Sequence, residues 1–126
     1  MAKIYLFIAA LSGFVAVGLG AFGAHGLKQR LGPDLLAVYQ TGVQYQFVHT
    51  VALLVVAALM LHWPSSTQLR WSAALFCVGM LIFSGSLYVL SLTGIRWLGA
   101  ITPIGGVAFL AGWLALAWAA LKAEGL

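Results

Sequence analysis

The amino-acid sequence predicts an all-α integral membrane protein, a four-helix bundle formed by one domain of residues 1–126. Of its residues, 63% are hydrophobic and only 6% are charged, whereas soluble domains have roughly 45–50% and 25%. The apolar residues also form continuous runs, without the alternating pattern of a membrane β-strand. The lipid bilayer is therefore the expected solvent and the first expected partner of the chain.

The first transmembrane helix is predicted near residues 4–24, since about 20 apolar residues cross a bilayer. Small residues at four-residue spacing mark this span and the last one: Ala16, Gly20 and Ala24 in the first, Ala108 and Gly112 in the last. Small residues let membrane helices approach closely. We therefore expect the first and last spans to pack together, with contact between two copies of the chain as the alternative.

The second span is predicted near residues 47–63 and is preceded by a helix start at Gly32-Pro33-Asp34. Proline lacks the N–H that a first-turn residue leaves unpaired, and an aspartate is favourable at a helix N-terminus. Apolar residues then recur at helical spacing. We expect an amphipathic helix over 34–46, between spans 1 and 2, which either lies at the membrane surface or continues into the second span. A surface role is favoured over ligand binding for this helix.

The remaining spans are predicted near residues 70–92 and 98–121, with a short turn before each. Four spans place both termini on one side of the membrane. Each side carries three basic residues: Lys3, Arg70 and Lys122 on the side of the termini, and Lys28, Arg30 and Arg96 on the other. The positive-inside rule therefore gives no orientation. We expect the termini to face the cytoplasm, with insertion in both orientations as the alternative.

The tryptophans fall near the predicted helix ends, with one exception. Trp63, Trp71 and Trp118 lie near the side of the termini and Trp97 near the other side, where indole rings anchor helices at the headgroups. Trp113 falls deeper, and we expect it to take part in packing.

Uncharged polar residues collect in the half of the bundle away from the termini. The candidate residues are His25, Tyr39, Tyr45, Gln46, His49, Ser84, Ser86, Tyr88 and Thr102. On a helix, His49 shares a face with Tyr45 and Gln46. Thr102-Pro103, followed by Gly105-Gly106, is expected to kink the last span. An internal hydrogen-bond network is the favoured interpretation; a pocket for a lipid, a quinone-like molecule or a transported solute is the alternative.

Residue types exclude several chemistries. The only carboxylates, Asp34 and Glu124, lie near opposite ends, so neither an acid–base pair nor a hydrolase triad is expected, and we predict no catalytic residue. His25 and His49 lack a third ligand for a metal site, and we predict no metal and no cofactor. The single cysteine, Cys77, can form no intrachain disulfide. The scattered basic residues form no nucleic-acid-binding patch.

Four segments together resemble a known family. They are Ala21-Phe22-Gly23-Ala24-His25-Gly26-Leu27; Tyr39 and Gly42 with Tyr45-Gln46 and His49; Phe83-Ser84-Gly85-Ser86-Leu87-Tyr88; and Thr102-Pro103-Ile104-Gly105-Gly106 with Gly112-Trp113. The chain resembles domain-of-unknown-function family 423 of small bacterial inner-membrane proteins, to which the eukaryotic transmembrane protein 256 group is similar. The resemblance implies a multi-pass inner-membrane protein of unassigned activity.

The residues and the resemblance together lead us to expect a non-enzymatic component that serves interaction, assembly or lipid contact. A protein partner or a second copy of the chain is the expected alternative to lipid as the contacting molecule. Two other functions stay open at this point. One is a minimal small-solute transporter working as a dual-topology dimer, and the other is a haem- or quinone-binding protein.

Overall fold

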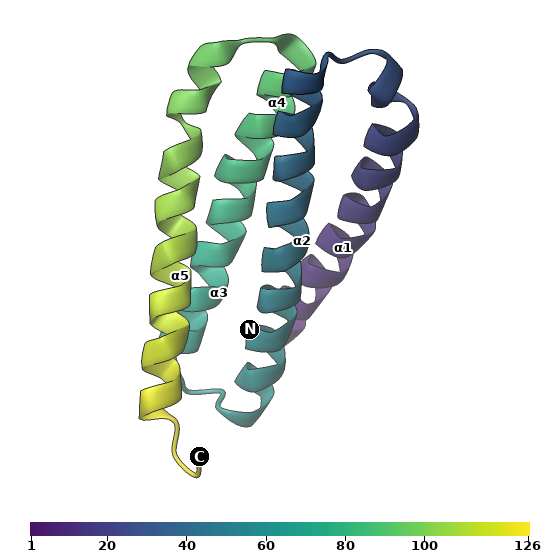
Figure 1. The fold of residues 1–126 in the computed structure, drawn as a ribbon. Helices are drawn as coiled ribbons and strands as arrows, with labels where there is room; N and C mark the ends of the chain where they lie inside the picture. Colours follow the sequence, from purple (N-terminus) through teal and green to yellow (C-terminus); the bar gives the residue numbers. More distant parts are fainter.

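The computed structural model describes residues 1–126, is helical over most of its length and contains no strand (Figure 1). Its α-helices are α1 (Ala2–His25), α2 (Pro33–His62), α3 (Thr67–Gly79), α4 (Gly85–Thr93) and α5 (Thr102–Lys122). A π-helical turn (Met80–Ser84) joins α3 to α4, and 3₁₀ helices (Leu27–Gln29 and Arg96–Ala100) precede α2 and α5. Four helical stretches are long and apolar enough to span a membrane: Ala2–Gln29, Pro33–His62, Thr67–Thr93 and Arg96–Lys122. This confirms the predicted all-α membrane bundle.

The helices are arranged with α1 and α5 at opposite edges of the bundle (Figure 1). α1 packs along α2, and α5 packs along α3 and the π-helical turn. The expected packing of the first span against the last is therefore wrong. The small residues of α1 serve a different neighbour: Ala9, Ala16 and Gly23 are buried, and a Cβ added at Gly20 would lie 3.6 Å from Val43 of α2.

α2 is one continuous helix of 30 residues. The amphipathic stretch 34–46 is its first half, so a separate helix between spans 1 and 2 does not exist, and the second of the two expected geometries is the observed one. Pro33 occupies the first turn and Asp34 lies beside the helix N-terminus, as the residues of the helix start predict. The consequence is that Tyr39, Gln46 and His49 are all buried along a single rigid element.

The third span is irregular within its length, whereas the fourth is irregular only at its start, where the 3₁₀ helix Arg96–Ala100 precedes α5. Thr102 and Pro103 begin α5, where proline removes no helical hydrogen bond, so the expected kink is wrong. Instead the π-helical turn Met80–Ser84 interrupts the third span. α5 approaches this turn closely at Gly105, where an added Cβ would lie 2.8 Å from the Cα of Phe83.

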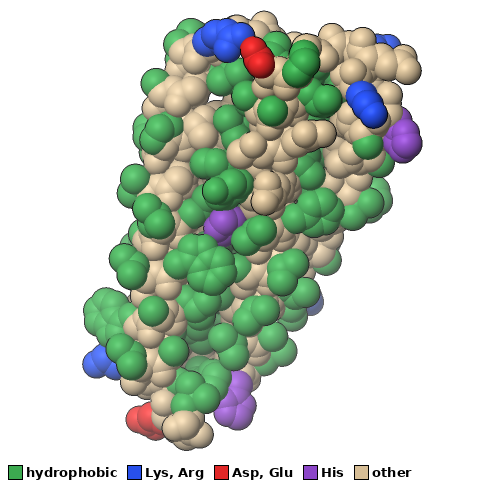
Figure 2. All heavy atoms as spheres, in the orientation of Figure 1, with side chains coloured by type: hydrophobic (Ala, Val, Ile, Leu, Met, Phe, Trp, Pro, Cys, Tyr) green, Lys and Arg blue, Asp and Glu red, His purple; other side chains and the backbone are tan.

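The charged residues gather at the two ends of the molecule, and hydrophobic side chains cover the length between them (Figure 2). Many of these side chains are large and exposed, for example Phe14 at 77% and Leu110 at 68%. In water such a surface would be an aggregation liability. In a bilayer it is the surface that contacts lipid.

Candidate functional site

The imidazole of His49 is held in one tautomer by two hydrogen bonds. Its Nδ1 lies 2.8 Å from the carbonyl oxygen of Tyr45, one helical turn earlier, and its Nε2 lies 3.0 Å from the indole N–H of Trp113 on α5. An indole N–H can only donate, so Nε2 is the acceptor and the imidazole proton is on Nδ1. The ring is therefore neutral, and both of its nitrogens are occupied.

Aromatic rings enclose this imidazole on several sides. The ring of Phe109 stacks on it, with centroids 3.6 Å apart and planes inclined by 10°. Phe76 approaches edge-on with a centroid distance of 5.5 Å, and Tyr45 is stacked at 6.1 Å. His49 is 3% exposed as a result. These rings fill the space between α2 and α5 and leave the imidazole little freedom to turn.

The occupied nitrogens bear on the haem alternative, because an axial ligand needs a free ring-nitrogen lone pair. In His49 that lone pair accepts the hydrogen bond from Trp113. His25 ends α1 and is exposed. No group of three His, Cys, Asp or Glu residues lies close enough together to hold a metal ion. The geometry thus gives no support to a bis-histidine haem site.

Gln46 ties three helices together. Its amide N–H donates to the carbonyl oxygen of Ser12 on α1 at 3.1 Å and to the Oγ of Ser12 at 3.2 Å. Its Oε1 accepts from the hydroxyl of Tyr88 on α4 at 2.5 Å. The Ser12 Oγ also lies 2.7 Å from the Oγ1 of Thr50. A single glutamine therefore links α1, α2 and α4 inside the apolar interior.

Two side-chain hydroxyl groups donate hydrogen bonds to backbone carbonyl oxygens of neighbouring helices. Ser84 Oγ donates to the carbonyl oxygen of Gly42 at 2.7 Å, and the Tyr39 hydroxyl donates to that of Leu19 at 2.5 Å. Gly42 also makes room for Tyr88, since an added Cβ would lie 2.8 Å from Cε1 of that ring. These contacts fix the first half of α2 against both α1 and the third span.

A third, separate pair joins the third span to the start of α5. Ser86 Oγ lies 2.6 Å from the Oγ1 of Thr102 and donates to the carbonyl oxygen of Phe83 at 2.9 Å. Thr102, the first residue of α5, is thus hydrogen-bonded to a side chain of α4.

The structure brings most of the nine predicted residues into internal hydrogen bonds. Those bonded through their side chains are Tyr39, Gln46, His49, Ser84, Ser86, Tyr88 and Thr102. Tyr45 contributes its carbonyl oxygen and its ring, while its side chain is 41% exposed. His25 is not part of the cluster. No buried side-chain nitrogen or oxygen lacks a partner, so the cluster has the character of the internal network that the sequence favours.

The sequence interpretation missed three members of this network, Ser12, Thr50 and Trp113. Ser12 is one of few polar residues in an otherwise apolar span, and Trp113 is an indole far from the helix ends. Each carries a polar hydrogen that must find an acceptor inside the membrane. Trp113 packs against Phe76, as expected, and also donates a hydrogen bond to His49. Its N–H is the signal that could have identified it.

An apolar groove opens on the lipid-facing side of the α2–α5 seam, beside His49 and Trp113. It has a volume of about 530 Å³. Its lining residues are all hydrophobic: Phe47, Val48, Val51, Ala52, Val55, Trp113 and Leu116. We call it the seam groove. None of the nine predicted residues lines it, but the hydrogen bond to His49 sets the position of Trp113, which forms one of its walls.

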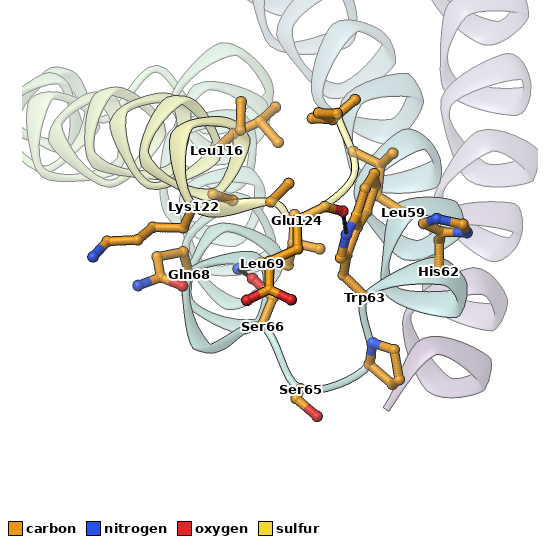
Figure 3. Close-up of a pocket in the computed structure, with 15 residues that line it drawn as sticks. Leu59, His62, Trp63, Ser65, Ser66, Gln68, Leu69, Leu116, Lys122 and Glu124 are labelled. Carbon is orange, nitrogen blue, oxygen red and sulfur yellow. Dashed lines mark hydrogen bonds between the residues drawn. The ribbon is translucent and has the colours of Figure 1, made fainter.

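A second cavity, of about 500 Å³, lies at the end of the bundle that carries the termini (Figure 3). We call it the end cavity. Its inner lining includes Leu59, Leu69, Leu116 and Ala119, and polar or charged side chains of Trp63, Gln68, Lys122 and Glu124 lie around it. The indole N–H of Trp63 donates to the carbonyl oxygen of Glu124 at 3.0 Å. That bond holds the segment after α5 against the end of α2.

Comparison with known proteins gives relatives along nearly the whole chain. A model of the family described as "Protein of unknown function (DUF423)" matches residues 19–106. The UPF0382 membrane protein of Staphylococcus epidermidis is 44% identical over 98% of this chain and 99% of its own length. YwdK of Bacillus subtilis, also a UPF0382 membrane protein, is 45% identical over 95% and 98%. The UPF0382 inner membrane protein YgdD of Escherichia coli is 42% identical over 95% and 91%.

No solved structure matches the chain. The relatives are membrane proteins by name, and this chain has four helical stretches that can span a bilayer. On this evidence the chain is a multi-pass membrane protein, and it belongs to the DUF423 family of proteins of unknown function.

Proposed function

We propose that this protein is a non-catalytic lipid-binding component of the bacterial inner membrane, which holds a hydrocarbon chain in the seam groove. The observation that carries the proposal is the groove itself: an entirely apolar lining with one wall, Trp113, fixed by a hydrogen bond to a buried histidine. The name of the Escherichia coli relative, an inner membrane protein, supports the location.

The polar cluster supports a structural rather than a catalytic role for its residues. Catalysis needs a group that is free to exchange a proton or attack a substrate. Here the buried polar atoms already have partners. The two carboxylates, Asp34 and Glu124, belong to the start of α2 and the segment after α5, at opposite ends of the bundle. Neither can orient His49, so we propose that the protein is not an enzyme.

The lining of the groove favours a hydrocarbon chain over a protein helix. Helix interfaces in membranes favour small residues, and Ala52 is the one small residue among the seven that line the groove. Flexible hydrocarbon fits such a surface without a register of small side chains.

A groove-filling substitution tests the proposal. Val51 lines the groove and is 58% exposed, so Val51→Trp fills the space without entering the core. The matched control is Leu54→Trp, on the same helix, 46% exposed and outside the groove. Native mass spectrometry of the detergent-extracted protein should show fewer retained lipids for Val51→Trp than for the control. Equal retention by the two variants contradicts the proposal.

The same experiment separates the other occupants. A particle that falls from two chains to one only in Val51→Trp would assign the groove to a second copy of the chain. A protein partner lost only from that variant would assign it to that partner. A quinone found in the organic extract of the wild type, and lost in Val51→Trp, would assign it to a redox lipid. Each result replaces the hydrocarbon chain of a membrane lipid as the occupant.

A second candidate, a dual-topology transporter, is favoured by one observation: three basic residues at each end of the molecule. Such a balance permits insertion in both orientations. Tags at both termini, probed for accessibility from each side of the membrane, decide between the candidates. Our proposal expects a single orientation, with the termini in the cytoplasm. Equal populations of both orientations would favour the transporter.

A further inference from the structure

The seam groove and the end cavity lie along the same pair of helices and share one lining residue. Leu116 of α5 lines both of them. On the α2 side, Val55 lines the groove and Leu59, one turn further along, lines the end cavity. The two hollows therefore follow one another along the α2–α5 seam, from the middle of the bundle to the end that carries the termini.

The length of this path matches one leaflet of a bilayer. Trp113 lines the groove and Lys122 lines the end cavity. They are nine residues apart on α5, and a rise of 1.5 Å per residue gives about 13.5 Å. Half of a hydrocarbon core of about 30 Å is about 15 Å. A chain that reaches from Lys122 to Trp113 therefore has the depth of a single acyl chain.

The end cavity has the composition of a headgroup site. Its inner lining is leucine and alanine, and its outer residues include one cation, Lys122, and one anion, Glu124. Figure 3 shows the Lys122 side chain extending outward from the other lining residues, with Gln68 beside it, and the Glu124 carboxylate near Ser66. Trp63 forms a wall next to Glu124, in the position where indole rings meet lipid headgroups.

The charges favour a headgroup with both signs. A lipid phosphate is a strong acceptor for the Lys122 ammonium group. A ligand ammonium group is the complementary donor for the Glu124 carboxylate. Arg70, whose guanidinium donates to the Ser65 carbonyl oxygen at 3.4 Å, is a second cation at this end of the molecule. A purely anionic headgroup would satisfy the cations but place its negative charge beside Glu124.

We infer that the two hollows form one site for a phospholipid whose headgroup carries an ammonium group as well as a phosphate. The headgroup lies in the end cavity between Lys122 and Glu124, and one acyl chain follows Leu116 into the seam groove as far as Trp113. This inference rests on the proposed function and adds to it the headgroup chemistry and the leaflet, which is the one on the side of the termini.

Competition between two lipids tests the headgroup. The full chain is reconstituted with equal amounts of phosphatidylethanolamine and phosphatidylglycerol bearing identical acyl chains, and the retained lipids are counted by native mass spectrometry. The wild type should retain phosphatidylethanolamine over phosphatidylglycerol by about two- to fivefold, the range that an exposed ion pair supplies. Glu124→Gln should bring the ratio close to one without lowering total retention. Lys122→Gln should lower retention of both lipids.

Two control variants remove a charge of the same sign elsewhere in the chain. Asp34→Asn removes the other carboxylate, at the opposite end, and should keep the wild-type preference; Lys3→Gln removes a cation outside the cavity and should keep total retention. Water-soluble glycerophosphoethanolamine, added in excess, should not displace the lipid. If it displaces the lipid fully, the site is for a free zwitterion and the inference of a lipid is overturned.

The outcomes separate this inference from the proposed function. If Val51→Trp and Leu54→Trp retain equal amounts of lipid, the proposed function fails. If Val51→Trp loses lipid but Glu124→Gln keeps the wild-type preference for phosphatidylethanolamine, the seam groove holds a chain and the headgroup assignment alone is overturned.

Discussion

The indole N–H of Trp113 on α5 donates a hydrogen bond to Nε2 of His49 on α2, at 3.0 Å. This bond joins a buried polar side chain to a side chain that faces the lipid, because His49 is 3% exposed and Trp113 is 42% exposed. The hydrogen bond therefore fixes the position of the indole ring that forms one wall of the seam groove.

Replacement of Trp113 by phenylalanine should destabilise the fold and loosen the groove. The change keeps an aromatic ring but leaves the buried Nε2 of His49 without its donor. We expect a loss of about 0.6–2 kcal/mol in the free energy of unfolding, within the range for such bonds in membranes and for orphaned buried acceptors. Thermal unfolding in detergent measures it. Trp118→Phe is the control, since Trp118 is 56% exposed, and it should unfold like the wild type.

The tautomer of His49 can be read directly. We expect ¹⁵N NMR of the wild type, with histidine labelled, to show a protonated Nδ1 and an unprotonated Nε2 for this residue, as the two hydrogen bonds require. In Trp113→Phe the Nε2 resonance should shift, because its hydrogen bond is gone. A wild-type spectrum with the proton on Nε2 would show that Trp113 does not donate to the ring.

His49→Gln should be tolerated as far as the fold is concerned. A glutamine can still accept a hydrogen bond, although it loses the ring stacked on Phe109 at 3.6 Å. We expect a folded protein with a modest fall in thermal stability, measured by circular dichroism against temperature. Complete loss of the folded protein would mean that the imidazole does more than satisfy this network.

Gln46 and Tyr88 should be energetically coupled. Their side chains share a hydrogen bond of 2.5 Å between α2 and α4. A double-mutant cycle with Gln46→Leu and Tyr88→Phe should give a coupling of roughly 0.6–1.7 kcal/mol, the range measured for hydrogen bonds between membrane helices. The readout is the unfolding free energy in mixed micelles. Strict additivity of the two substitutions would show that the bond is absent in the folded state.

Gly105→Ala should destabilise the bundle, because the added methyl group meets the backbone of Phe83, with its Cβ 2.8 Å from Cα. Overpacking of this kind costs about 1–3 kcal/mol. Gly85→Ala is the control within the same helical bundle. An added Cβ at Gly85 has no atom within 4 Å, so that variant should be as stable as the wild type or slightly more stable.

The membrane fold follows from the composition and the four apolar runs, because a bilayer leaves few alternatives to long helices. The packing order does not follow. Span 1 carries small residues that fit any close neighbour, and lipid gives a membrane helix no polar face to mark its exposed side. Only the structure shows that Ala16 and Gly20 serve α2 rather than α5.

Most residues of the candidate site could be predicted from the sequence, but their hydrogen-bond partners on other helices could not. Spacing on one helix places Tyr45 one turn before His49, and the structure confirms that contact through the backbone. Spacing also suggested Gln46 as a partner of His49, whereas Gln46 bonds Ser12 and Tyr88 on other helices. Contacts between helices depend on their relative rotation. The π-helical turn Met80–Ser84 changes the rotation of the third span relative to its neighbours, and no sequence pattern predicted this turn.

The position of a bound acyl chain is the most direct evidence for or against lipid binding in the seam groove. Crystals of the full chain grown in a lipid mesophase, doped with phospholipid brominated along one chain, would locate the bromine atoms by anomalous scattering. We expect a bromine peak in the seam groove, between Val51 and Trp113. Bromine spread evenly around the bundle, with no peak in the groove, would contradict this expectation.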